Sequence, residues 1–412
     1  MTNAASSSPP AVRADGSDLL DSYDVVCVGG AVIGSAVAYF LTEDPAFTGN
    51  VLVVEPDSTY EFAQSSRAQN CIREQFSNPM NIQICQFGLD FMANFEENVQ
   101  VDGQAPALNF TGTGYLFLAK TDEEMKVLEE AHSTQIGQGA DVRMLTPTQV
   151  AEEFPYMNVD GLLGARVGSL REGNFDGWGL MQGYRLRAVR NGATYLKDRV
   201  VGFEMGTDRV QRVLLESGRS VACGDVVNSA GPRARLIAQM AGLDVPVEPR
   251  ARSSFVFSCR TEIPENVPLT VTPEGVHFRR EQGHYMCGTA PENDVAVAYD
   301  DWAVRADEFE DLIWPVLASY VPAFDRLSVM TNWGGQYAYN TLDHNLIVGP
   351  SEQVTNLHFA NGFSGHGLQQ SAAVGRAVSE LIIDGDYRTL DLSRLGYDRI
   401  IRNEPFLETA VI

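Results

Sequence analysis

The sequence predicts an α/β fold with two domains, and three observations carry that prediction. Residues 23–56 contain a short apolar β run, a glycine turn, an amphipathic helix and a second apolar β run. A strand, a glycine-rich turn and a helix occur again at 356–385. Residues 253–335 consist mainly of β segments separated by turns. The two strand–turn–helix units indicate a Rossmann-like domain, and the β-rich stretch indicates a second domain with a mainly antiparallel or mixed sheet. The length of 412 residues also exceeds the usual size of one domain.

The first strand–turn–helix unit predicts a dinucleotide site. Gly29 permits a tight turn after the first strand, and the small residues Ala31 and Gly34 let a pyrophosphate approach the backbone at the start of the helix. Glu55 ends the second strand, 21 residues after Gly34, where a carboxylate can bind the ribose hydroxyls of an adenosine. An ordinary βαβ unit is the alternative, and the glycines alone do not distinguish FAD from NAD.

Composition limits the classes of partner and site. The formal net charge of −24 opposes nucleic acid and anionic membrane surfaces, so a carboxylate substrate would need local positive charge. The six cysteines contain no C-x-x-C pair, which favours reduced thiols in a cytoplasmic protein over a disulfide framework or a metal site. Residues 1–21 have no basic start followed by an apolar core and predict a disordered tail. Because no stretch of 18 uninterrupted apolar residues occurs, we expect no membrane span.

Hydrophobic spacing predicts the remaining elements in chain order. Helices are expected at 81–95, at 122–138, from Thr146 with Pro147 in the first turn, from a cap at Asn174 or Asp176 to near Gly192, at 235–241 and at 307–320. Strands are expected at 111–118, 199–203, 210–216 and 223–231. The last strand ends in small residues, which fits a close approach to a ligand or a plain strand-to-helix turn.

Several motifs along the chain resemble one family. They are VCVGGAVIG with Glu55, SSRAQNCIREQFS, VVNSAGPRA, YNTLDHNLIVG and NGFSGHGLQQSAAVG. Together they resemble the FAD-dependent oxidoreductases grouped with D-amino acid oxidase and sarcosine oxidase, over nearly the whole chain from Tyr23. With GHYMCGTAPE and WPVLASYVPAF, the pattern looks closest to the branch of FAD-dependent oxidoreductase domain-containing proteins linked to assembly of mitochondrial complex I.

The resemblance implies an FAD-binding domain assembled from separated segments. We predict that residues 22–107, 168–248 and 334–412 form this domain, and that 108–167 and 249–333 form the substrate domain. The residues expected at the pyrophosphate and ribose are Gly29, Gly30, Ala31, Val32, Ile33, Gly34, Glu55 and Pro56. Those expected near phosphates, adenine or the ribityl chain are Ser65, Ser66, Arg67, Gln69, Asn70, Val200, Ala230 and Gly231. Those expected at the isoalloxazine are Gly335, Gly362, Phe363, Ser364, Gly365, His366, Gly367 and Leu368, beside a helix end whose positive potential stabilises the reduced ring.

Four residues are candidates for the substrate site. The resemblance implies that Arg73 clamps a substrate carboxylate, because a guanidinium offers a fork of donors; an ordinary surface arginine is the alternative. His366 is either a catalytic residue at the flavin edge or a structural loop histidine. His277 and Tyr285 lie in β segments expected to face the ring, and both are candidates for shaping the pocket.

Three positions depart from the sarcosine oxidase pattern. Gln369 replaces a lysine that helps to bind carboxylate, Met286 replaces the lysine thought to activate dioxygen, and Gln336 replaces the cysteine that carries flavin covalently. These departures imply a substrate other than the usual small one, slow reduction of dioxygen, and noncovalent FAD.

The predicted reaction is FAD-dependent oxidation of the C–N bond of an amino acid or secondary (N-alkyl) amine. Hydride passes from carbon to flavin N5, and water hydrolyses the resulting imine. An acceptor protein or a quinone is the expected destination of the electrons. One alternative is oxidation of a 2-hydroxy acid, which requires a base for the hydroxyl. The other is a non-catalytic, FAD-containing assembly subunit.

Overall fold

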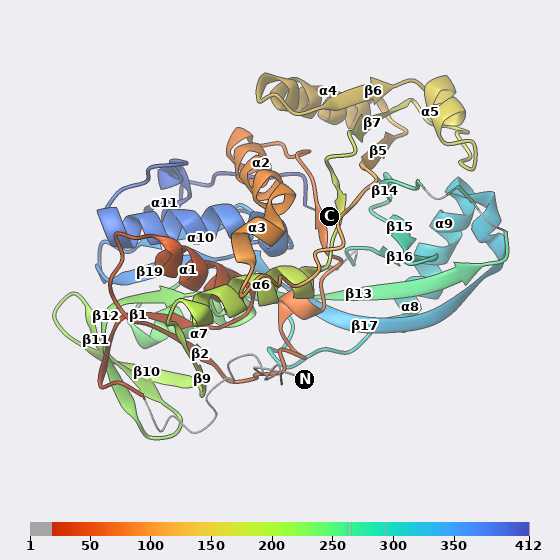
Figure 1. Cartoon of the computed structure of the whole chain (residues 1–412). Coiled ribbons are helices and arrows are strands. Elements are labelled where there is room, and N and C mark those ends of the chain that lie inside the picture. Colours follow the sequence, from red (N-terminus) through yellow and green to blue (C-terminus); the bar gives the residue numbers. More distant parts are fainter. Residues whose placement is uncertain (1–18, 262, 265, 292, 412) are drawn as a thin grey trace.

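The computed structural model describes residues 19–261, 263–264, 266–291 and 293–411 (Figure 1). Most of the tail predicted at 1–21 therefore lies outside the described residues. The Asp21 carbonyl accepts a hydrogen bond from the N–H of Ala222, so the chain is already held beside a strand at that point.

The first of two large sheets has eight strands and a parallel centre. Strands β9, β2, β1, β12 and β19 run parallel in that spatial order, while β10, β11 and β18 pair antiparallel at its margins. Their bounds are β1 Ser22–Val28, β2 Val51–Glu55, β9 Thr194–Lys197, β10 Val200–Met205, β11 Val210–Leu215, β12 Ser220–Asn228, β18 Ile347–Pro350 and β19 Leu357–Asn361. The parallel pairing confirms the Rossmann-like arrangement, because β1, β12 and β19 bring their carboxyl ends to one edge of the sheet.

Alternate residues of β1 face two separate cores, as strand geometry requires. Val25 and Cys27 pack in the core beneath helices α1, α6 and α10, whereas Val26 and Val28 pack in the core that includes α7. The helices of the first layer are α1 Val32–Glu43, α2 Pro79–Ala93, α3 Phe95–Val99, α6 Gly177–Arg190 and α10 Gly367–Asp384; α7 Ala234–Met240 and α11 Asp398–Arg402 complete this part of the molecule.

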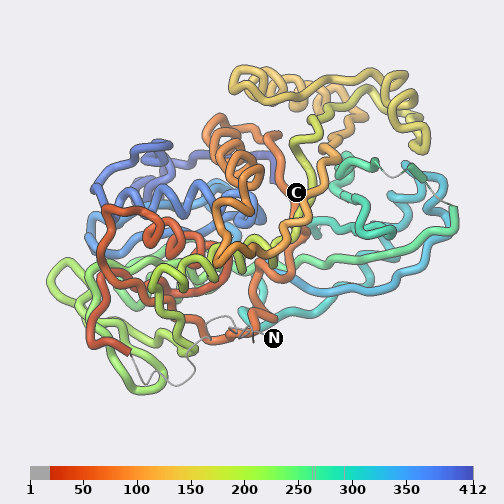
Figure 2. Tube along the Cα trace, viewed as in Figure 1, coloured from red at the N-terminus to blue at the C-terminus, as the bar shows by residue number. Residues whose placement is uncertain are grey.

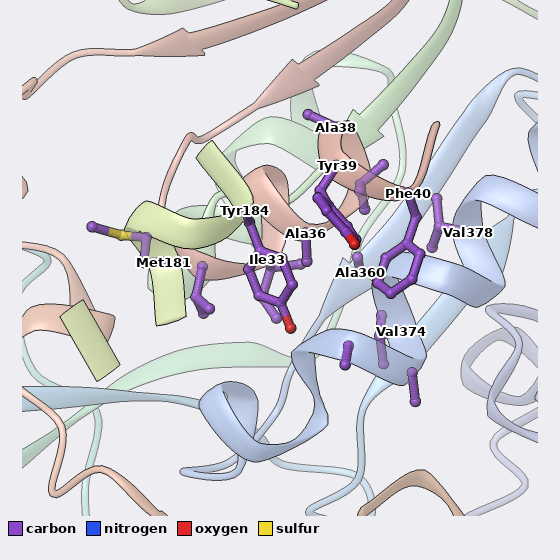
Figure 3. Close-up of a cluster of buried hydrophobic side chains, with 14 of the residues drawn as sticks. Ile33, Ala36, Ala38, Tyr39, Phe40, Met181, Tyr184, Ala360, Val374 and Val378 are labelled. Atoms are coloured by element: carbon purple, nitrogen blue, oxygen red, sulfur yellow. The ribbon is translucent and has the colours of Figure 1, made fainter. Parts of the chain in front are cut away.

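The aromatic residues of α1 form the centre of the first core. Figure 3 shows Tyr39 and Phe40 between Tyr184 of α6 and Val378 of α10. The rings of Tyr39 and Tyr184 lie 5.4 Å apart between centroids. The helix that follows the glycine turn is thus fixed on both sides by buried side chains.

The second large sheet also has eight strands, in the order β17-β13-β16-β15-β14-β5-β7-β6. Among the described strands of this second sheet, only β14 and β5 pair parallel, so the sheet is mixed, as predicted. Their bounds are β5 Tyr115–Ala119, β6 Val142–Leu145, β7 Gly164–Gly168, β13 Val247–Cys259, β14 Leu269–Val271, β15 His277–Glu281, β16 His284–Gly288 and β17 Leu327–Asn340. Helices α4 Asp122–Gly137, α5 Pro147–Glu153, α8 Ala306–Glu308 and α9 Trp314–Tyr320 belong to this part.

Two helices begin at predicted capping residues, and a third predicted helix contains a turn of a different type. Asp176, rather than Asn174, caps α6 by accepting the N–H of Gly179, and Thr146 caps α5. The single helix predicted at 307–320 contains a π-helical turn at Phe309–Ile313, before Pro315. Proline has no N–H to continue an α-helical ladder, which accounts for the change of winding there.

The strand predicted at 111–118 is divided between two sheets. β4 (Thr111–Gly112) joins β3 (Cys71–Ile72) and β8 (Gly173–Asn174) in a small three-stranded sheet, while β5 belongs to the second large sheet. Gly114 between them has a φ of 75°, which ends the extended run.

Strands β13 and β17 connect the two halves of the molecule (Figure 1). They pair antiparallel over the whole of β13, so they cross the boundaries predicted at 248/249 and 333/334 without interruption. Val247 belongs to the α7 core, and Phe257 belongs to the core of the second sheet. The predicted domain boundaries stay predictions. None of the helices in the described part of the chain has the length and apolarity that a membrane crossing needs.

Candidate functional site

A cavity of about 1010 Å³ lies between the two large sheets and the loops at their edges. We call one part the glycine end, lined by Gly29, Ala31, Glu55, Val200 and Ala230. We call another part the arginine end, lined by Arg73, Tyr115, His277, Tyr337 and His366. The glycine end lies at the carboxyl ends of β1, β2 and β12, where open α/β sheets bind their ligands.

The glycine end is shaped by backbone packing. Gly29 has a φ of 100°, and a Cβ there would lie 2.6 Å from the Ser229 carbonyl oxygen. A Cβ on Gly34 would lie 1.9 Å from the Gly29 carbonyl oxygen. Neither position has room for a side chain, so the turn brings the start of α1 close to the cavity. The N-cap residue Ala31 provides no side-chain cap, and no acidic residue lies in the first turn of α1. The Ser65 hydroxyl accepts the N–H of Val32 at 3.3 Å, and the positive end of the helix faces the cavity beside it.

Glu55 organises the same turn. Its Oε2 accepts the N–H of Gly30 at 2.9 Å, and its Oε1 accepts the N–H of Asp57 at 3.0 Å. Burial raises the pKa of Glu55 above its ordinary value, while the two backbone hydrogen bonds oppose that shift. The carboxylate therefore links the glycine turn to the end of β2 and lines the cavity.

The loop before α10 lies against β17 in a backbone shape that its glycines permit. Gly362, Ser364 and Gly365 all have positive φ. The Ser364 N–H donates to Ala338 at 3.0 Å, and its Oγ accepts the N–H of Asn340 at 3.1 Å. A Cβ on Gly365 would lie 2.5 Å from the Tyr337 ring. The loop thereby brings the uncapped amino end of the long helix α10 to the arginine end.

Arg73 is buried at the arginine end, with 2% of its surface exposed. Its Nε donates to the Gln75 carbonyl at 3.1 Å, and its Nη2 lies 3.4 Å from His366 Nε2. The Arg73 backbone N–H donates to Gln369 Oε1 at 3.1 Å. Among the described residues, no carboxylate lies within salt-bridge distance of this guanidinium. Arg73 is therefore a buried cation that makes no ion pair with the described residues, although the charge of the buried Glu172 acts on it from a greater distance.

The two histidines of the arginine end are neutral at pH 7. Burial, with the neighbouring Arg252, Arg279 and Arg73, lowers the pKa of His277 to about 4. Burial and Arg73 lower the pKa of His366 well below its ordinary value. Because neither imidazole is protonated, the positive charge at the arginine end comes from the guanidinium groups of the neighbouring arginines.

Most residues predicted from the sequence line this cavity. They are Gly29, Ala31, Val32, Ile33, Glu55, Pro56, Ser65, Arg67, Gln69, Asn70, Arg73, Val200, Ala230, Gly231, His277, Gly335, Phe363, Gly365, His366, Gly367 and Leu368. Gly30, Gly34, Gly362 and Ser364 lie behind its wall and shape the turns, and Ser66 is exposed. The cavity thus collects the predicted residues from widely separated segments, while their roles stay predictions.

Tyr285 differs from its prediction because strand residues alternate between faces. Its ring stacks on Phe257 at 5.4 Å between centroids and contacts Phe324 at 4.8 Å, within the core of the second sheet. Met286 points to the other face, where its sulfur lies 3.5 Å from Arg279 Nη2. Tyr285 therefore belongs to the core of the second sheet and does not line the cavity, contrary to the expectation that its strand turns it toward the ring.

Sequence reasoning missed several residues of the lining. They include Tyr60, Phe62, Gln64, Tyr115, Arg252, Ser254, Thr289, Trp302 and Tyr337. Arg252 and Ser254 are two residues apart on β13, so the alternation of that strand was the available signal. The alternation of side chains along β13 does not predict which face of the sheet lies against the cavity.

The cavity fits a large polar ligand such as FAD. Four lining residues carry a buried polar atom without a hydrogen-bond partner in the described structure: Asn70 Oδ1, Arg252 Nε, His277 Nδ1 and Gln336 Oε1. Such atoms are costly unless something satisfies them. The glycine turn, the amino end of α1 and Glu55 are the features that a dinucleotide requires, and the amino end of α10 borders the same cavity.

Comparisons with known proteins agree with this geometry. A family model described as DAO, FAD dependent oxidoreductase, matches residues 24–381. FAD-dependent oxidoreductase domain-containing protein 1 of Xenopus laevis is 37% identical over 94% of this chain and 85% of its own length. The crystal structure of L-proline dehydrogenase from P. horikoshii has a TM-score of 0.80 at 24% identity, covering 94% of this chain and all of that one. Glycine oxidase from Geobacillus kaustophilus has a TM-score of 0.78 at 20% identity, covering 92% of this chain and 98% of its own.

Proposed function

The chain belongs to the DAO family of FAD-dependent oxidoreductases, and on that premise we propose that it oxidises the C–N bond of an amino acid or N-alkyl amine whose carboxylate binds Arg73. FAD is its cofactor, and when bound it supplies the hydride acceptor. The glycine end would hold the dinucleotide, with Glu55 at the ribose and the start of α1 at the pyrophosphate. The loop before α10 would border the flavin.

The observation that carries the substrate class is the buried guanidinium of Arg73. A buried cation that contacts no carboxylate among the described residues is costly, and an acidic protein repels free carboxylates from a distance. A substrate carboxylate would neutralise the buried guanidinium, and the positive charge of Arg73 would in turn offset the long-range repulsion of that carboxylate. The fork of N–H donors suits a carboxylate better than an ammonium does.

The other groups of the arginine end favour an amine over an alcohol. The carboxylates of the described lining are Glu55, Asp57, Glu61 and Asp300, and none of them lies on the elements that carry Arg73, His277 or His366. A hydroxy acid needs a strong base to remove its hydroxyl proton. An amine can react in its neutral form, so this lining suits an amine substrate.

The substrate class is tested by anaerobic bleaching of the FAD-loaded protein with amino acids, N-alkyl amino acids, amines without a carboxylate, and 2-hydroxy acids. We expect bleaching by carboxylate-bearing amines and none by the matched amines that lack the carboxylate. Bleaching only by hydroxy acids would replace the proposal with the alcohol reaction. Flavin that no compound reduces, together with a stable protein partner in a pull-down, would favour the assembly subunit.

We also propose that the flavin is noncovalent and that electrons leave to a protein or quinone acceptor in a cytoplasmic setting. Gln336, at the position where a cysteine would carry flavin, donates its amide to the Ala298 and Asp301 carbonyls. All six cysteines are free thiols. Acid precipitation should therefore release yellow supernatant from a colourless pellet.

A further inference from the structure

The last described residues return to the arginine end of the cavity. After α11 the chain passes the turn that follows β17, and its end lies near α2 and β5 (Figure 2). The Phe406 N–H donates to Asp343 Oδ2 at 2.9 Å, and the Phe406 carbonyl accepts from Asn345 Nδ2 at 3.0 Å. This part of the segment is fixed by side chains that belong to the fold.

Glu408 is the anchor of this segment. It is fully buried, and its carboxylate accepts hydrogen bonds from Ser77 Oγ at 2.6 Å and Asn81 Nδ2 at 2.9 Å. It also accepts the backbone N–H groups of Ser77 at 3.0 Å and Asn78 at 3.2 Å, at the amino end of α2. Four hydrogen bonds at the amino end of α2 thus hold this buried carboxyl group in place.

Beyond Glu408 the chain contacts Arg73. The Ala410 carbonyl accepts a hydrogen bond from Arg73 Nη2. The Thr409 N–H donates to Ser77 Oγ at 3.0 Å, and the Ala410 N–H donates to the Glu408 carboxylate. With the bond from Arg73 to the Ala410 carbonyl, these are the hydrogen bonds found for the described residues after Glu408. We call residues 409–411 the C-terminal strap.

The strap uses the donors that a bidentate carboxylate needs. A guanidinium has five N–H donors, one on Nε and two on each Nη. Nε is used by Gln75, and Nη2 faces both the Ala410 carbonyl and His366. A bidentate carboxylate requires donors from two adjacent nitrogens, and the pairs Nε–Nη2 and Nη1–Nη2 both include Nη2.

We propose that the C-terminal strap closes the arginine end and must leave Arg73 before a carboxylate binds there. A carboxylate can displace the strap, because a hydrogen bond between two charged groups is stronger than one from a cation to a neutral carbonyl. An amine without a carboxylate has no group with which to make that exchange. The strap is therefore a selectivity device for anionic substrates, and the inference rests on the proposed role of Arg73 as a carboxylate clamp.

The test measures carboxylate binding to the FAD-loaded protein through the visible absorbance of the flavin, with acetate and benzoate as probes. A variant that ends after Glu408 keeps the anchor and lacks the strap. We expect it to bind both probes roughly tenfold more tightly than the full chain, the effect of regaining one hydrogen bond to a charged group. Leu407→Ala, at an exposed side chain of the same segment, should bind them like the full chain.

A second measurement needs no variant. Saturating acetate should increase hydrogen exchange in the peptide that contains residues 409–411 of the full chain, and leave the peptides of α10 unchanged. Equal probe affinity with and without the strap, or unchanged exchange, would overturn the strap while leaving the clamp in place. Probe binding that Arg73→Lys does not weaken in either background would overturn the clamp and the strap together.

Discussion

The glycine end of the cavity is built from the backbone at the ends of neighbouring strands and the Glu55 carboxylate, whereas the arginine end is assembled from side chains of separate segments. Gly29, Gly34 and Glu55 belong to one continuous unit of the chain. Arg73, His277 and His366 come from the segment after β3, from β15 and from the loop before α10. The turn, helix start and carboxylate of the first end come from one local unit, to which the chain just after β12 adds Ser229 and Ala230, whereas the second end exists only after the two sheets have packed. Damage to the first should therefore remove the cofactor, while damage to the second should change the substrate chemistry and leave the cofactor bound.

The largest effect is expected from Gly34→Ala. The new Cβ would lie 1.9 Å from the Gly29 carbonyl oxygen, and backbone cannot move aside as a flexible side chain does. We expect a loss of about 3 kcal/mol or more in stability and of most bound FAD, measured by the ratio of flavin to protein absorbance. Gly137→Ala is the matched control, because nothing lies within 4 Å of its Cβ. FAD content like that of the wild type in Gly34→Ala would show that the turn tolerates a side chain.

Arg73→Lys should weaken substrate binding at the arginine end and leave FAD binding at the glycine end unchanged. Lysine keeps the charge and loses the fork, and one lost charged hydrogen bond corresponds to about 1.5 to 3 kcal/mol, or roughly ten- to a hundredfold in substrate binding. Anaerobic stopped-flow reduction against substrate concentration measures the change, with FAD content unaltered. Arg171→Lys, in an exposed ion pair with Asp90, is the control. Wild-type reduction kinetics in Arg73→Lys would remove the clamp.

These two variants also mark how far the sequence alone can predict the molecule. The spacing of Gly29, Gly34 and Glu55 reflects contacts between residues close in the chain, so the motif predicts both the fold and the location of the glycine end. The approach of Ala410 to Arg73 joins residues 337 positions apart, and nothing in either local sequence indicates it. Tyr285 and Met286 form a similar case. Their strand was predicted, but the side of the sheet that faces the cavity depends on packing with Phe257 and Phe324.

His277 should make the arginine end sensitive to acid. Its pKa is about 4 in the folded protein and near 6.5 when unfolded, so the unfolded state takes up the proton first as pH falls. This group's contribution is complete above pH 6.5 and is lost as pH falls from there towards 4. Between pH 7 and pH 5 the loss should be about 2 kcal/mol.

Denaturant unfolding of wild type and His277→Gln at the two pH values measures that loss. We expect the difference in unfolding free energy between the two pH values to be smaller in the variant. An equal difference in both proteins would assign the acid sensitivity to other groups, such as His366, whose pKa is lowered in the same direction.

The smallest effect is expected from Met286→Lys. We expect the wild-type reduced protein to react slowly with dioxygen, because Met286 carries no charge to stabilise a developing superoxide-like anion. A lysine should accelerate reoxidation only a few-fold. Arg279 Nη2 already lies 3.5 Å from the Met286 sulfur, although Glu281 balances the charge of that guanidinium. Stopped-flow reoxidation of the photoreduced proteins in air-saturated buffer measures both rates, and fast reoxidation of the wild type would make it an oxidase.

The continuous pairing of β13 with β17 has a mechanical consequence. The ribbon runs from the α7 core into the second sheet, and its one register shift, between Val256 and Phe257, lies within the second sheet. Where it passes from one half of the molecule to the other it contains no loop at which one half could swing relative to the other. Opening by rotation of rigid bodies is thereby disfavoured. Ligand entry and release must instead use short segments at the rim, and heating should melt the two halves in one cooperative transition instead of two.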